Sequence, residues 1–594
     1  MNKKNIFLWI LALVVGFIFS LHNLIPYLVA QENPQFVYTP FNGGDENLYA
    51  SQIREVYEGK FFSGDPFILE TKNFHPFLPW LGSLIFGLLA KLFNSLELVF
   101  LLSDFFLPAI IFLLIFKFVF KITQHYWGSI LSGLSTLFLY QLTTKFPPVT
   151  PGLLQGFWQT LTLKPAYFFS FSRLIPPQFT FIIFMVFLFS LYQTLITQNK
   201  SWPLLTGFFA GVLAYLYFYH WSASLMILAA AWALSLFISK SNSSRLFFAL
   251  AISLFISSYF LFKTFAYSDL VKQISFGRLD GRFFEPLTSL RYGLISLFIF
   301  FIPLKKTVKQ LLLSIFISAI VLMNLQVIVG FTLAPGHWPH STFEPLLVIS
   351  SFIILSISFK KYFPDSWRVG LLVIPVLSYA LFNQIKITHQ WQSLYFLSSS
   401  EVKLFNWLNQ NTPPESVVLT LDKRLNRYLP VLTSNNLYLP YGSYSQLSTD
   451  QLWQRINLAF SLFHLTREGM TSYFTNTQFI GQLFDQTYNY HQKSNLAGLD
   501  FPKNIKNKIS TAHPIFTFGV RYIPDNIKQQ NINQSLQLIN LPLKDRLCQF
   551  KLNYLLTTQQ SEWQNLNPQY FISLFQADDL KLFHVKSDIC QLNT

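Results

Sequence analysis

Long apolar runs, separated by short polar turns, fill the first two thirds of the chain. Runs of roughly 17–25 mostly apolar residues are long enough to cross a bilayer as helices. On that criterion we predict eleven membrane-spanning helices, near residues 5–26, 97–118, 126–141, 179–197, 203–219, 221–239, 245–266, 289–304, 311–332, 343–359 and 368–386. The apolar run at 76–93 is either a further span or an amphipathic helix lying in the membrane interface.

Basic residues decide between these two options. With 76–93 on the outer surface, the positive-inside rule is obeyed, because the predicted inner turns then receive Lys117, Lys121, Lys200, Lys240, Arg245, Lys305, Lys306, Lys309, Lys360, Lys361 and Arg368. Counting 76–93 as a span would move all of these residues outside. We therefore predict a multi-pass protein of the cytoplasmic (plasma) membrane. Its N-terminus is cytoplasmic, its first outer loop covers about 31–96, and 76–93 is an interfacial helix.

The first apolar run begins directly after Lys3 and Lys4 and continues to about Ala30. It is longer than the apolar part of a cleaved signal peptide and lacks a clear cleavage site of small residues. We predict a retained membrane anchor.

The character of the chain changes after about residue 382. Residues 387–594 are mixed and rich in Asn, Gln and Ser. The pattern at 401–410 predicts an amphipathic helix, and 416–421 a buried strand, with later strands at 517–523, 551–557 and 581–585. The predicted fold is mostly α: a helical membrane domain over 1–386, followed by an extracytoplasmic α/β domain over 387–594.

Both cysteines, Cys548 and Cys590, lie in this second domain. In an extracytoplasmic compartment they can form one disulfide. The alternatives are two free thiols or two small apolar side chains, and the sequence leaves these open.

Composition agrees with a membrane protein that carries a soluble part. The chain is 52% hydrophobic and only 12% charged, and it contains 67 phenylalanines. Its net charge of +16 comes from basic residues in turns, and no basic stripe is interleaved with base-stacking aromatic residues. No nucleic-acid partner is expected.

The first acidic cluster of the chain falls in the first outer loop, within residues 42–49. Asp45, Tyr49, Ile53 and Val56 recur at helical spacing, which predicts a short helix over 45–58 that stops at Gly59. The helix dipole favours a carboxylate at the N-terminal end, so Asp45 taken alone is most simply a helix cap. An ionisable group at a membrane surface is nevertheless a functional-site hypothesis.

The order Asp45-Glu46-x-x-Tyr49-x-x-x-Ile53, followed by Glu58-Gly59 and Asp65-Pro66, resembles the first-loop signature of GT-C glycosyltransferases. That superfamily includes protein mannosyltransferases, aminoarabinose transferases and the catalytic subunits of oligosaccharyltransferases. The segment at 75–80, His-Pro-Phe-Leu-Pro-Trp, is similar to the proline-rich segment before their interfacial helix. The resemblance also covers the topology of 1–386 and the presence of an outer C-terminal domain.

The resemblance implies a membrane enzyme with a polyprenyl-phosphate-linked sugar as donor. The sugar would pass, with inversion, to a glycan, lipid or protein acceptor at the outer surface. Asp45 would act as general base, and such positioned proton transfer contributes about 10²–10⁴-fold to the rate. Glu46 would orient Asp45 or share a metal with it.

The sequence departs from the family pattern in its second large outer loop. Metal-dependent members carry a second acidic motif there, whereas residues 141–178 contain no Asp or Glu. Divalent cations prefer several oxygen ligands, and Asp104, inside the second span, is a poor substitute. No cofactor is expected, and a divalent metal at Asp45 and Glu46 is possible but not favoured.

The predicted outer loops also contain candidate substrate-binding residues. A leaving polyprenyl phosphate needs cationic or bidentate donors, and the candidates, together with the aromatic Tyr49, are Arg173, Arg278, Arg282, His337 and His340. The simpler interpretation of each is an anchor in the lipid headgroup region.

Two other functions remain open. A transporter or flippase for lipid-linked sugars would usually show broken helices, repeats and polar groups at mid-membrane. Here the spans are nearly free of charge, apart from Asp104 and Lys263. A catalytically inactive GT-C relative with an assembly role is the second alternative, and the missing second acidic motif keeps it in view.

Overall fold

The computed structural model describes most of the chain. The described residues are 3–40, 46–76, 78–139, 158, 162, 168–238, 240–266, 278–333, 336–359, 362, 365–440, 445–476, 479, 483, 523–558, 566–586 and 590.

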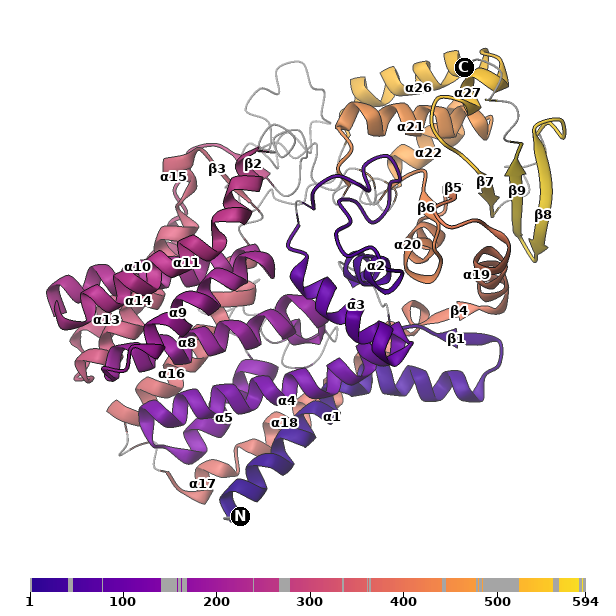
Figure 1. The fold of residues 1–594 in the computed structure, drawn as a ribbon. Coiled ribbons are helices and arrows are strands. Elements are labelled where there is room, and N and C mark those ends of the chain that lie inside the picture. Colours follow the sequence, from indigo (N-terminus) through magenta and orange to yellow (C-terminus); the bar gives the residue numbers. More distant parts are fainter. Residues whose placement is uncertain are drawn as a thin grey trace.

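Helices dominate the first two thirds of the described chain (Figure 1). They are α1 (Lys3–Glu32), α2 (Glu46–Tyr57), α3 (Leu81–Phe93), α4 (Leu96–Thr123), α5 (Tyr126–Phe138), η1 (Ser170–Ser172), η2 (Leu174–Phe179), α8 (Thr180–Ile196), α9 (Ser201–Val212), η3 (Leu213–Tyr215), α10 (Phe218–Ile238), α11 (Lys240–Ala266), α13 (Pro286–Phe301), α14 (Lys306–Met323), α15 (Gln326–Val329), η4 (Pro339–Phe343), α16 (Glu344–Ser358), α17 (Trp367–Gly370) and α18 (Val373–Gln390).

Each of the eleven predicted spans coincides with a helix. Eight helical segments in the described chain are long and apolar enough to cross a membrane: Lys4–Glu32, Leu96–Thr123, Leu174–Ile196, Phe218–Ile238, Asn242–Lys263, Lys306–Val329, Pro339–Ser358 and Trp367–Gln390. The predicted spans at 126–141, 203–219 and 289–304 correspond to the shorter helices α5, α9 and α13. These pack against long neighbours, α5 on α4, α9 on α8 and α11, and α13 on α14. The total of eleven spans remains a prediction.

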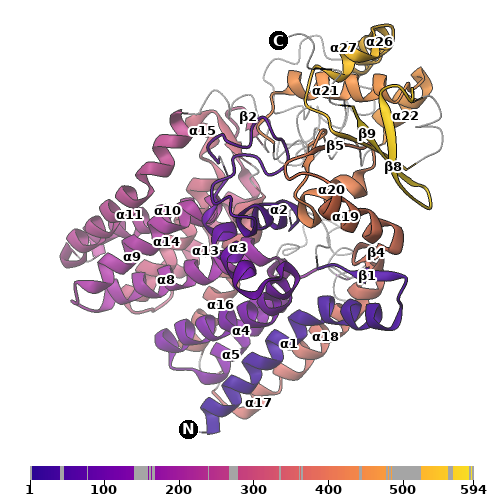
Figure 2. The same ribbon diagram turned by 45° about the vertical axis from the view of Figure 1, so that its right-hand side comes forward.

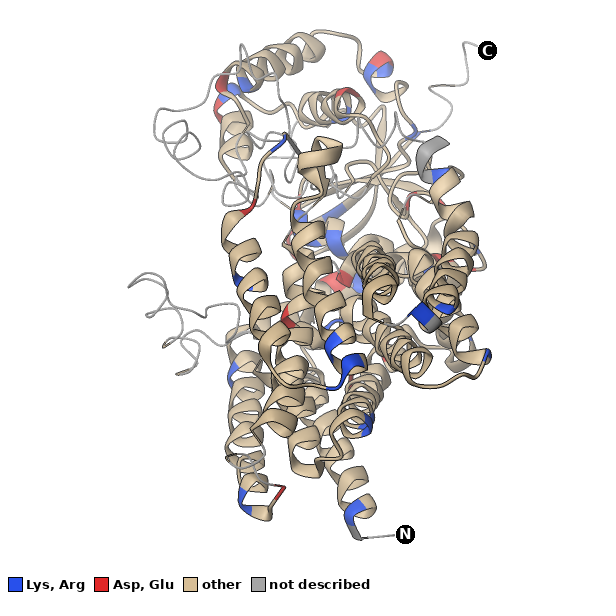
Figure 3. Cartoon of the chain, turned by 90° about the vertical axis from the view of Figure 1, so that its left-hand side faces the viewer, with Lys and Arg blue, Asp and Glu red and all other residues tan. Residues whose placement is uncertain are grey.

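Turns that were predicted to share a side of the membrane contact one another. The Tyr126 hydroxyl donates to the Lys4 carbonyl (2.7 Å), and the Trp127 N–H donates to Asp365 Oδ1 (2.9 Å). On the predicted outer side, β2 (Arg278–Asp280) pairs antiparallel with β3 (Phe331–Leu333). Figure 3 shows the long helices mostly tan, with few charged residues along them. The contacts agree with the predicted loop grouping, and the orientation in the membrane remains a prediction.

The last third forms a sheet-containing domain. Among the described residues its five-stranded sheet has the order β6-β5-β7-β9-β8, with β5 parallel to β6 and β7, and β9 antiparallel to β7 and β8. The strands are β5 (Val417–Leu419), β6 (Asn436–Leu437), β7 (Tyr554–Thr557), β8 (Phe571–Ala577) and β9 (Leu580–Val585). The helices are α19 (Ser399–Asn411), α20 (Lys423–Leu432), α21 (Thr449–Leu462), α22 (Arg467–Thr475), α26 (Asp525–Ile539) and α27 (Leu543–Leu547), with short η5 (Gln392–Leu394) before them.

Most sequence predictions for this domain are confirmed. The helix at 401–410 is α19, and the strands at 416–421, 551–557 and 581–585 are β5, β7 and β9. The strand expected at 517–523 lies outside the described residues except for its last residue. Strand β8 was missed because a bulge between Ser573 and Phe575 interrupts the alternation of its side chains.

A single hydrophobic core joins the membrane helices to this domain. It contains Leu48 and Ile53 of α2, Phe100 of α4, and Phe405 and Leu429 of α19 and α20. The short strands β1 (Phe36–Tyr38) and β4 (Phe396–Ser398) also pair antiparallel across the junction. Figures 1 and 2 show α2 and α3 between the helical bundle and the C-terminal domain. The first outer loop is therefore packed on both sides.

Cys548 and Cys590 are bonded, with 5.5 Å between their Cα atoms and a sequence separation of 42. Replacing both by serine is expected to lower the free energy of unfolding by about 2–4 kcal/mol, because the cross-link restricts the unfolded chain. Chemical denaturation with and without a reductant measures this. The reductant should shift the midpoint of the natural protein and leave that of the double-serine variant unchanged. Equal midpoints for the natural protein in both conditions would contradict the prediction.

Candidate functional site

The helix predicted for the first outer loop is α2, and its N-terminus is buried. It begins at Glu46, which is 8% exposed, and it ends before Gly59, whose φ of +100° suits a residue without a side chain. Asn47 Nδ2 donates to the Arg427 carbonyl of α20 (3.2 Å). The C-terminal domain thus covers the N-terminus of α2. Asp45, the predicted base, lies outside the described residues.

Tyr49 is half-buried and packs against the core that joins the two domains. One turn of helix separates it from the beginning of α2. Its proposed contact with substrate remains a prediction.

Asp104 of α4 is the centre of a buried polar cluster. Its Oδ1 accepts a hydrogen bond from Gln178 Nε2 (3.0 Å), and its Oδ2 accepts one from Asn23 Nδ2. His22 Nε2 lies 3.5 Å from the same Oδ2. An intramembrane acid needs such partners. The residue pattern singles out Asp104 but not its partners Asn23 and Gln178, although His22-Asn23 is a polar pair near the end of an apolar run.

Tyr38 is buried at the junction between the helical bundle and the C-terminal domain, in a core with Tyr395 and Phe396. Burial raises the pKa of its hydroxyl well above the ordinary value, and the nearby acidic groups Asp104, Tyr395, Glu97 and Glu46 raise it further. The side chain is 8% exposed, and its hydroxyl has no hydrogen-bond partner among the described residues. Tyr38 therefore stays neutral and can donate a hydrogen bond at this end of the bundle.

Arg173 is held near the same acid. It immediately precedes η2, and its carbonyl accepts a hydrogen bond from the Gln178 N–H (3.2 Å), while the Gln178 side chain binds Asp104. Arg173 itself is half-buried. The second large outer loop, which lacks acids in its sequence, thus contributes the Gln178 amide to Asp104, and the main chain of Arg173 is bonded to the same glutamine.

His337 and His340 belong to a second group of residues, at the start of α10 and around η4. His337 Nδ1 is 2.8 Å from the Tyr217 hydroxyl, and its ring stacks on Tyr219 at 4.6 Å. The buried His220 has Nε2 3.0 Å from the Ser341 carbonyl. His340 is exposed. Tyr217, Tyr219 and His220 were not predicted from the residue pattern, because aromatic residues at the end of a predicted span are typical of interface anchors.

Arg278 and Arg282 accompany this second group. The main chain of Arg278 opens β2 and pairs with Leu333, whose carbonyl accepts a hydrogen bond from the Tyr219 hydroxyl (3.2 Å). Arg282 Nη1 donates to the carbonyls of Val327 and Ile328 (2.7 and 2.8 Å), so it closes the end of α15.

The predicted site residues therefore do not form one cluster: Arg173 lies at the segment that holds Gln178 on Asp104, whereas His337 and the main chain of Arg278 lie around Tyr217 and Tyr219. Aromatic rings in contact connect the two regions. The ring centroid of Phe181 lies 5.0 Å from that of Phe171 and 5.9 Å from that of His220. Binding of all these residues to one phosphate remains a prediction.

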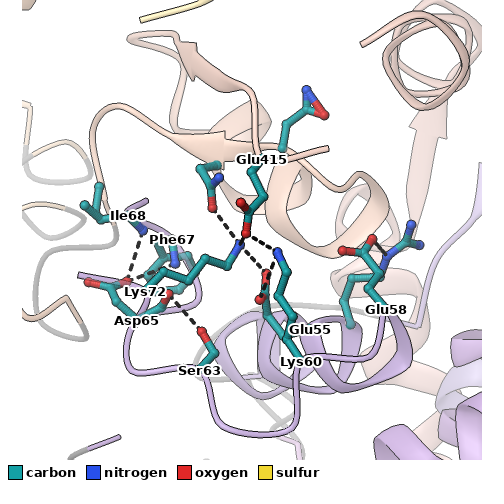
Figure 4. A network of polar contacts seen from close by, with 12 residues as sticks. Glu55, Glu58, Lys60, Ser63, Asp65, Phe67, Ile68, Lys72 and Glu415 are labelled. Atoms are coloured by element: carbon teal, nitrogen blue, oxygen red, sulfur yellow. Dashed lines mark hydrogen bonds and ion pairs between the residues drawn. The ribbon is translucent and has the colours of Figure 1, made fainter. Parts of the chain in front are cut away.

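A network of ion pairs and hydrogen bonds lies where the first outer loop meets the C-terminal domain (Figure 4). Lys72 Nζ lies 2.7 Å from Glu55 Oε1 and donates to Asn436 Oδ1 at 2.8 Å, while Lys60 pairs with Glu415. Burial raises the pKa of Glu55 and lowers that of Lys72, and the attraction between the two opposes both shifts. Each group therefore depends on the other to keep its charge.

Asp65 makes the second connection. Its Oδ1 accepts from the Phe67 and Ile68 N–H groups (2.9 and 3.2 Å), and its Oδ2 accepts from Ser445 Oγ (2.7 Å) and the Gln446 N–H (2.9 Å). It is fully buried, which raises its pKa, while these hydrogen bonds lower it. The aspartate of the Asp65-Pro66 motif thus holds the loop in shape and ties it to the second domain.

The part of the chain that the structure describes contains no group of three or more His, Cys, Asp or Glu residues placed to hold a metal ion. The expectation about a metal at Asp45 and Glu46 remains a prediction, since Asp45 is not among those residues.

No family model and no curated protein matches this chain. Among solved structures, it is similar to the crystal structure of the Archaeoglobus fulgidus oligosaccharyltransferase tethered to an acceptor peptide with the NVT sequon, at 10% identity and a TM-score of 0.41, covering 80% of this chain and 70% of that one. It is also similar to the archaeal oligosaccharyltransferase AglB from Archaeoglobus fulgidus in complex with an inhibitory peptide and a dolichol-phosphate, at 10% identity and a TM-score of 0.45, covering 98% and 89%.

Residues 45–66 resemble a first-loop signature that several groups of enzymes share, and oligosaccharyltransferases are one of these groups. At such low TM-scores these matches give no correspondence between individual residues.

Proposed function

We propose that this protein is a GT-C-type membrane glycosyltransferase. It transfers a sugar from a polyprenyl-phosphate donor to an acceptor at the outer face of the cytoplasmic membrane, with inversion at the anomeric carbon. Asp45 is the general base, and Glu46 orients it. The observation that supports this most is the placement of the motif helix, whose first residue Glu46 is buried where the bundle meets the C-terminal domain.

The surroundings of Glu46 suit acid–base chemistry. A helix N-terminus favours the ionised form of a carboxylate, which a general base needs at neutral pH. The charges of Asp104, Glu97 and Glu46 each raise the pKa of the buried Tyr38 hydroxyl. Burial strengthens such interactions because water no longer screens them.

Arg173 is the donor-phosphate ligand that we favour. It is half-buried, and the hydrogen bonds of Gln178 hold its segment beside Asp104. A guanidinium group binds phosphate in a bidentate manner. The Cys548–Cys590 bond supports an extracytoplasmic C-terminal domain, since disulfides persist in oxidising compartments.

Sugar transfer from a panel of radiolabelled polyprenyl-phosphate sugars tests this function. Membranes containing the protein are expected to transfer label from at least one donor to a membrane-associated acceptor, and EDTA is expected to leave the rate unchanged. Loss of transfer with EDTA would show that a metal takes part and would contradict the metal-independent mechanism. Membranes lacking the protein are the control. Absence of transfer from every donor would favour the transporter or the inactive relative.

A further inference from the structure

The predicted outer end of α11 contains a lysine to which the proposed function gives no role. Lys263 lies in the last turn of this helix, and its side chain is half-buried. Its Nζ lies 5.8 Å from the centroid of the Tyr259 ring. Among the described residues, no carboxylate forms an ion pair with Lys263. A charged side chain on a spanning helix needs an opposite charge or access to the headgroups.

His75 of the first outer loop contacts the same tyrosine. The ring centroids of His75 and Tyr259 lie 5.9 Å apart, and the two rings are nearly perpendicular. Partial burial lowers the pKa of His75, and the positive charge of Lys263 lowers it further. The two basic groups therefore repel each other whenever the histidine is protonated, and an anion bound to both would remove this repulsion.

Aromatic contacts place this part of the loop at the ends of two membrane helices. The ring centroid of Trp80 lies 4.7 Å from that of Phe62 and 6.3 Å from that of Tyr215, which ends η3. The Tyr215 hydroxyl donates a hydrogen bond to the Ile256 carbonyl of α11 (2.7 Å). Tryptophan and tyrosine gather at the interface between membrane and water. With the predicted orientation, the segment that begins at His75 therefore lies at the level of the outer headgroups.

The face of α11 that carries Lys263 is exposed to lipid. Phe255, Tyr259 and Lys263 follow one another at intervals of four residues, which places them on one face of the helix. Phe255, Tyr259 and the adjacent Phe262 are all exposed. Apolar side chains exposed on a spanning helix contact lipid tails. The abundant anion at the end of such a face is the phosphate of a phospholipid headgroup.

We propose that Lys263, His75 and Tyr259 form a binding site for the phosphate of a phospholipid in the outer leaflet. Lys263 supplies a positive charge, which strengthens hydrogen bonds to phosphate oxygens. His75 supplies a ring N–H, because an imidazole keeps at least one in either protonation state. The lipid chains lie along the exposed face of α11. The site does not depend on the proposed transferase function, since it needs neither a sugar donor nor an acceptor.

The bound lipid connects α11 to the part of the loop that the C-terminal domain already holds. The His75 carbonyl accepts a hydrogen bond from Gln446 Nε2 (3.0 Å), and the Gln446 N–H donates to Asp65 Oδ2 (2.9 Å). Because a ligand that binds only the folded state stabilises it, added phosphatidylglycerol should raise the melting temperature of the natural protein more than that of Lys263→Met.

Fluorescence quenching measures lipid binding at this position without reference to turnover. The two cysteines of the chain are bonded to each other, so Phe262→Cys supplies a single thiol beside the site for a fluorescent label. The labelled full-length protein is washed in maltoside detergent, which contains no phosphate, and is then titrated with phosphatidylglycerol that has brominated chains. Bromine quenches the label only at short range. Brominated diacylglycerol, which lacks the phosphate, is the lipid control and should bind more weakly.

Substitutions made in the labelled protein test the assigned groups. Lys263→Met is expected to weaken phosphatidylglycerol binding by about tenfold to hundredfold, the usual loss for a hydrogen bond to a charged group. His75→Ala should weaken it by about threefold to tenfold, and Lys263→Arg should bind nearly as the natural residue does. Lys309→Met is the matched control and should change nothing, because Lys309 lies 5.8 Å from the Phe300 ring at the predicted inner side.

Equal binding by the natural protein, Lys263→Met and His75→Ala would overturn the proposal, as would equal binding of diacylglycerol and phosphatidylglycerol. Polyprenyl phosphate without bromine is then added as a competitor. Displacement at a much lower concentration than unbrominated phosphatidylglycerol requires would assign the site to the sugar-donor lipid, and the phospholipid assignment would be wrong. Displacement only at a similar or higher concentration supports a phospholipid site.

Discussion

Asp45→Asn is expected to lower kcat for sugar transfer by about 10²–10⁴-fold, the contribution of a positioned general base. The amide has nearly the shape of the carboxylate but cannot take the proton of the acceptor hydroxyl. Helix α2 should still form, because asparagine caps helices as well as aspartate does. KM for the donor should change little, because the proposed phosphate ligand is Arg173. Initial rates over a range of donor concentrations measure both constants.

Two comparisons make this result specific. Asp450→Asn changes an exposed carboxylate in the first turn of α21 and should keep the natural rate. Glu46→Gln should lower kcat by less than Asp45→Asn, because Glu46 is assigned to orientation. A natural rate in Asp45→Asn would exclude Asp45 as the base. A greater loss of kcat in Glu46→Gln than in Asp45→Asn would indicate that Glu46 is the general base.

Lys72→Met is expected to destabilise the protein by about 3–5 kcal/mol, the usual cost of leaving one buried charge without its partner. Lys72 and Glu55 are 5% and 8% exposed and lie 2.7 Å apart. Without Lys72, the buried Glu55 carboxylate keeps only the more distant Lys60, whose Nζ is 3.9 Å from Oε2, so it must remain charged with a weaker partner or take up a proton. Because this pair joins α2 to the loop that contacts the C-terminal domain, the first loop should detach early on heating. The melting temperature in nanodiscs measures the effect.

The chain offers a matched control for this variant. Lys60 belongs to the same network, but its side chain is 34% exposed and that of its partner Glu415 is 40% exposed. Lys60→Met should therefore cost less than about 1 kcal/mol, as exposed pairs do. The double variant Lys72→Met with Glu55→Leu should recover most of the lost stability, because no buried charge remains. Equal effects of Lys60→Met and Lys72→Met would show that burial of the pair does not matter.

Most helices and strands of this protein can be predicted from short stretches of its sequence. Apolar runs long enough to cross a bilayer predict a helix at every one of the eleven positions, and side-chain periodicity predicts α2 and α19. Such predictions succeed because a helix or strand depends on the spacing of its own residues. The motif that starts with Asp45 is local in the same sense, so the sequence alone places it at the start of a helix.

The site depends on contacts between residues that are distant in the chain. Asn23 and Asp104 are 81 positions apart and Asp65 and Ser445 are 380 apart. A hydrophobic pattern shows which face of a helix is buried but not which neighbour covers it, so the sequence named Asp104 without its partners. For the same reason the sequence predicted two domains but not the hydrophobic core between them, to which Leu48 and Phe405 both belong.

The sequence by itself thus determined the helical membrane architecture, the α/β character of the last third and the acidic motif. The packing of segments in three dimensions adds that Cys548 and Cys590 are bonded and that α2 lies between the bundle and the C-terminal domain. The hydrogen bonds of a helix join residues about four positions apart, so a short stretch of sequence is enough to predict it. Burial, ion pairs and disulfides arise where separate segments pack together, so they depend on the whole fold.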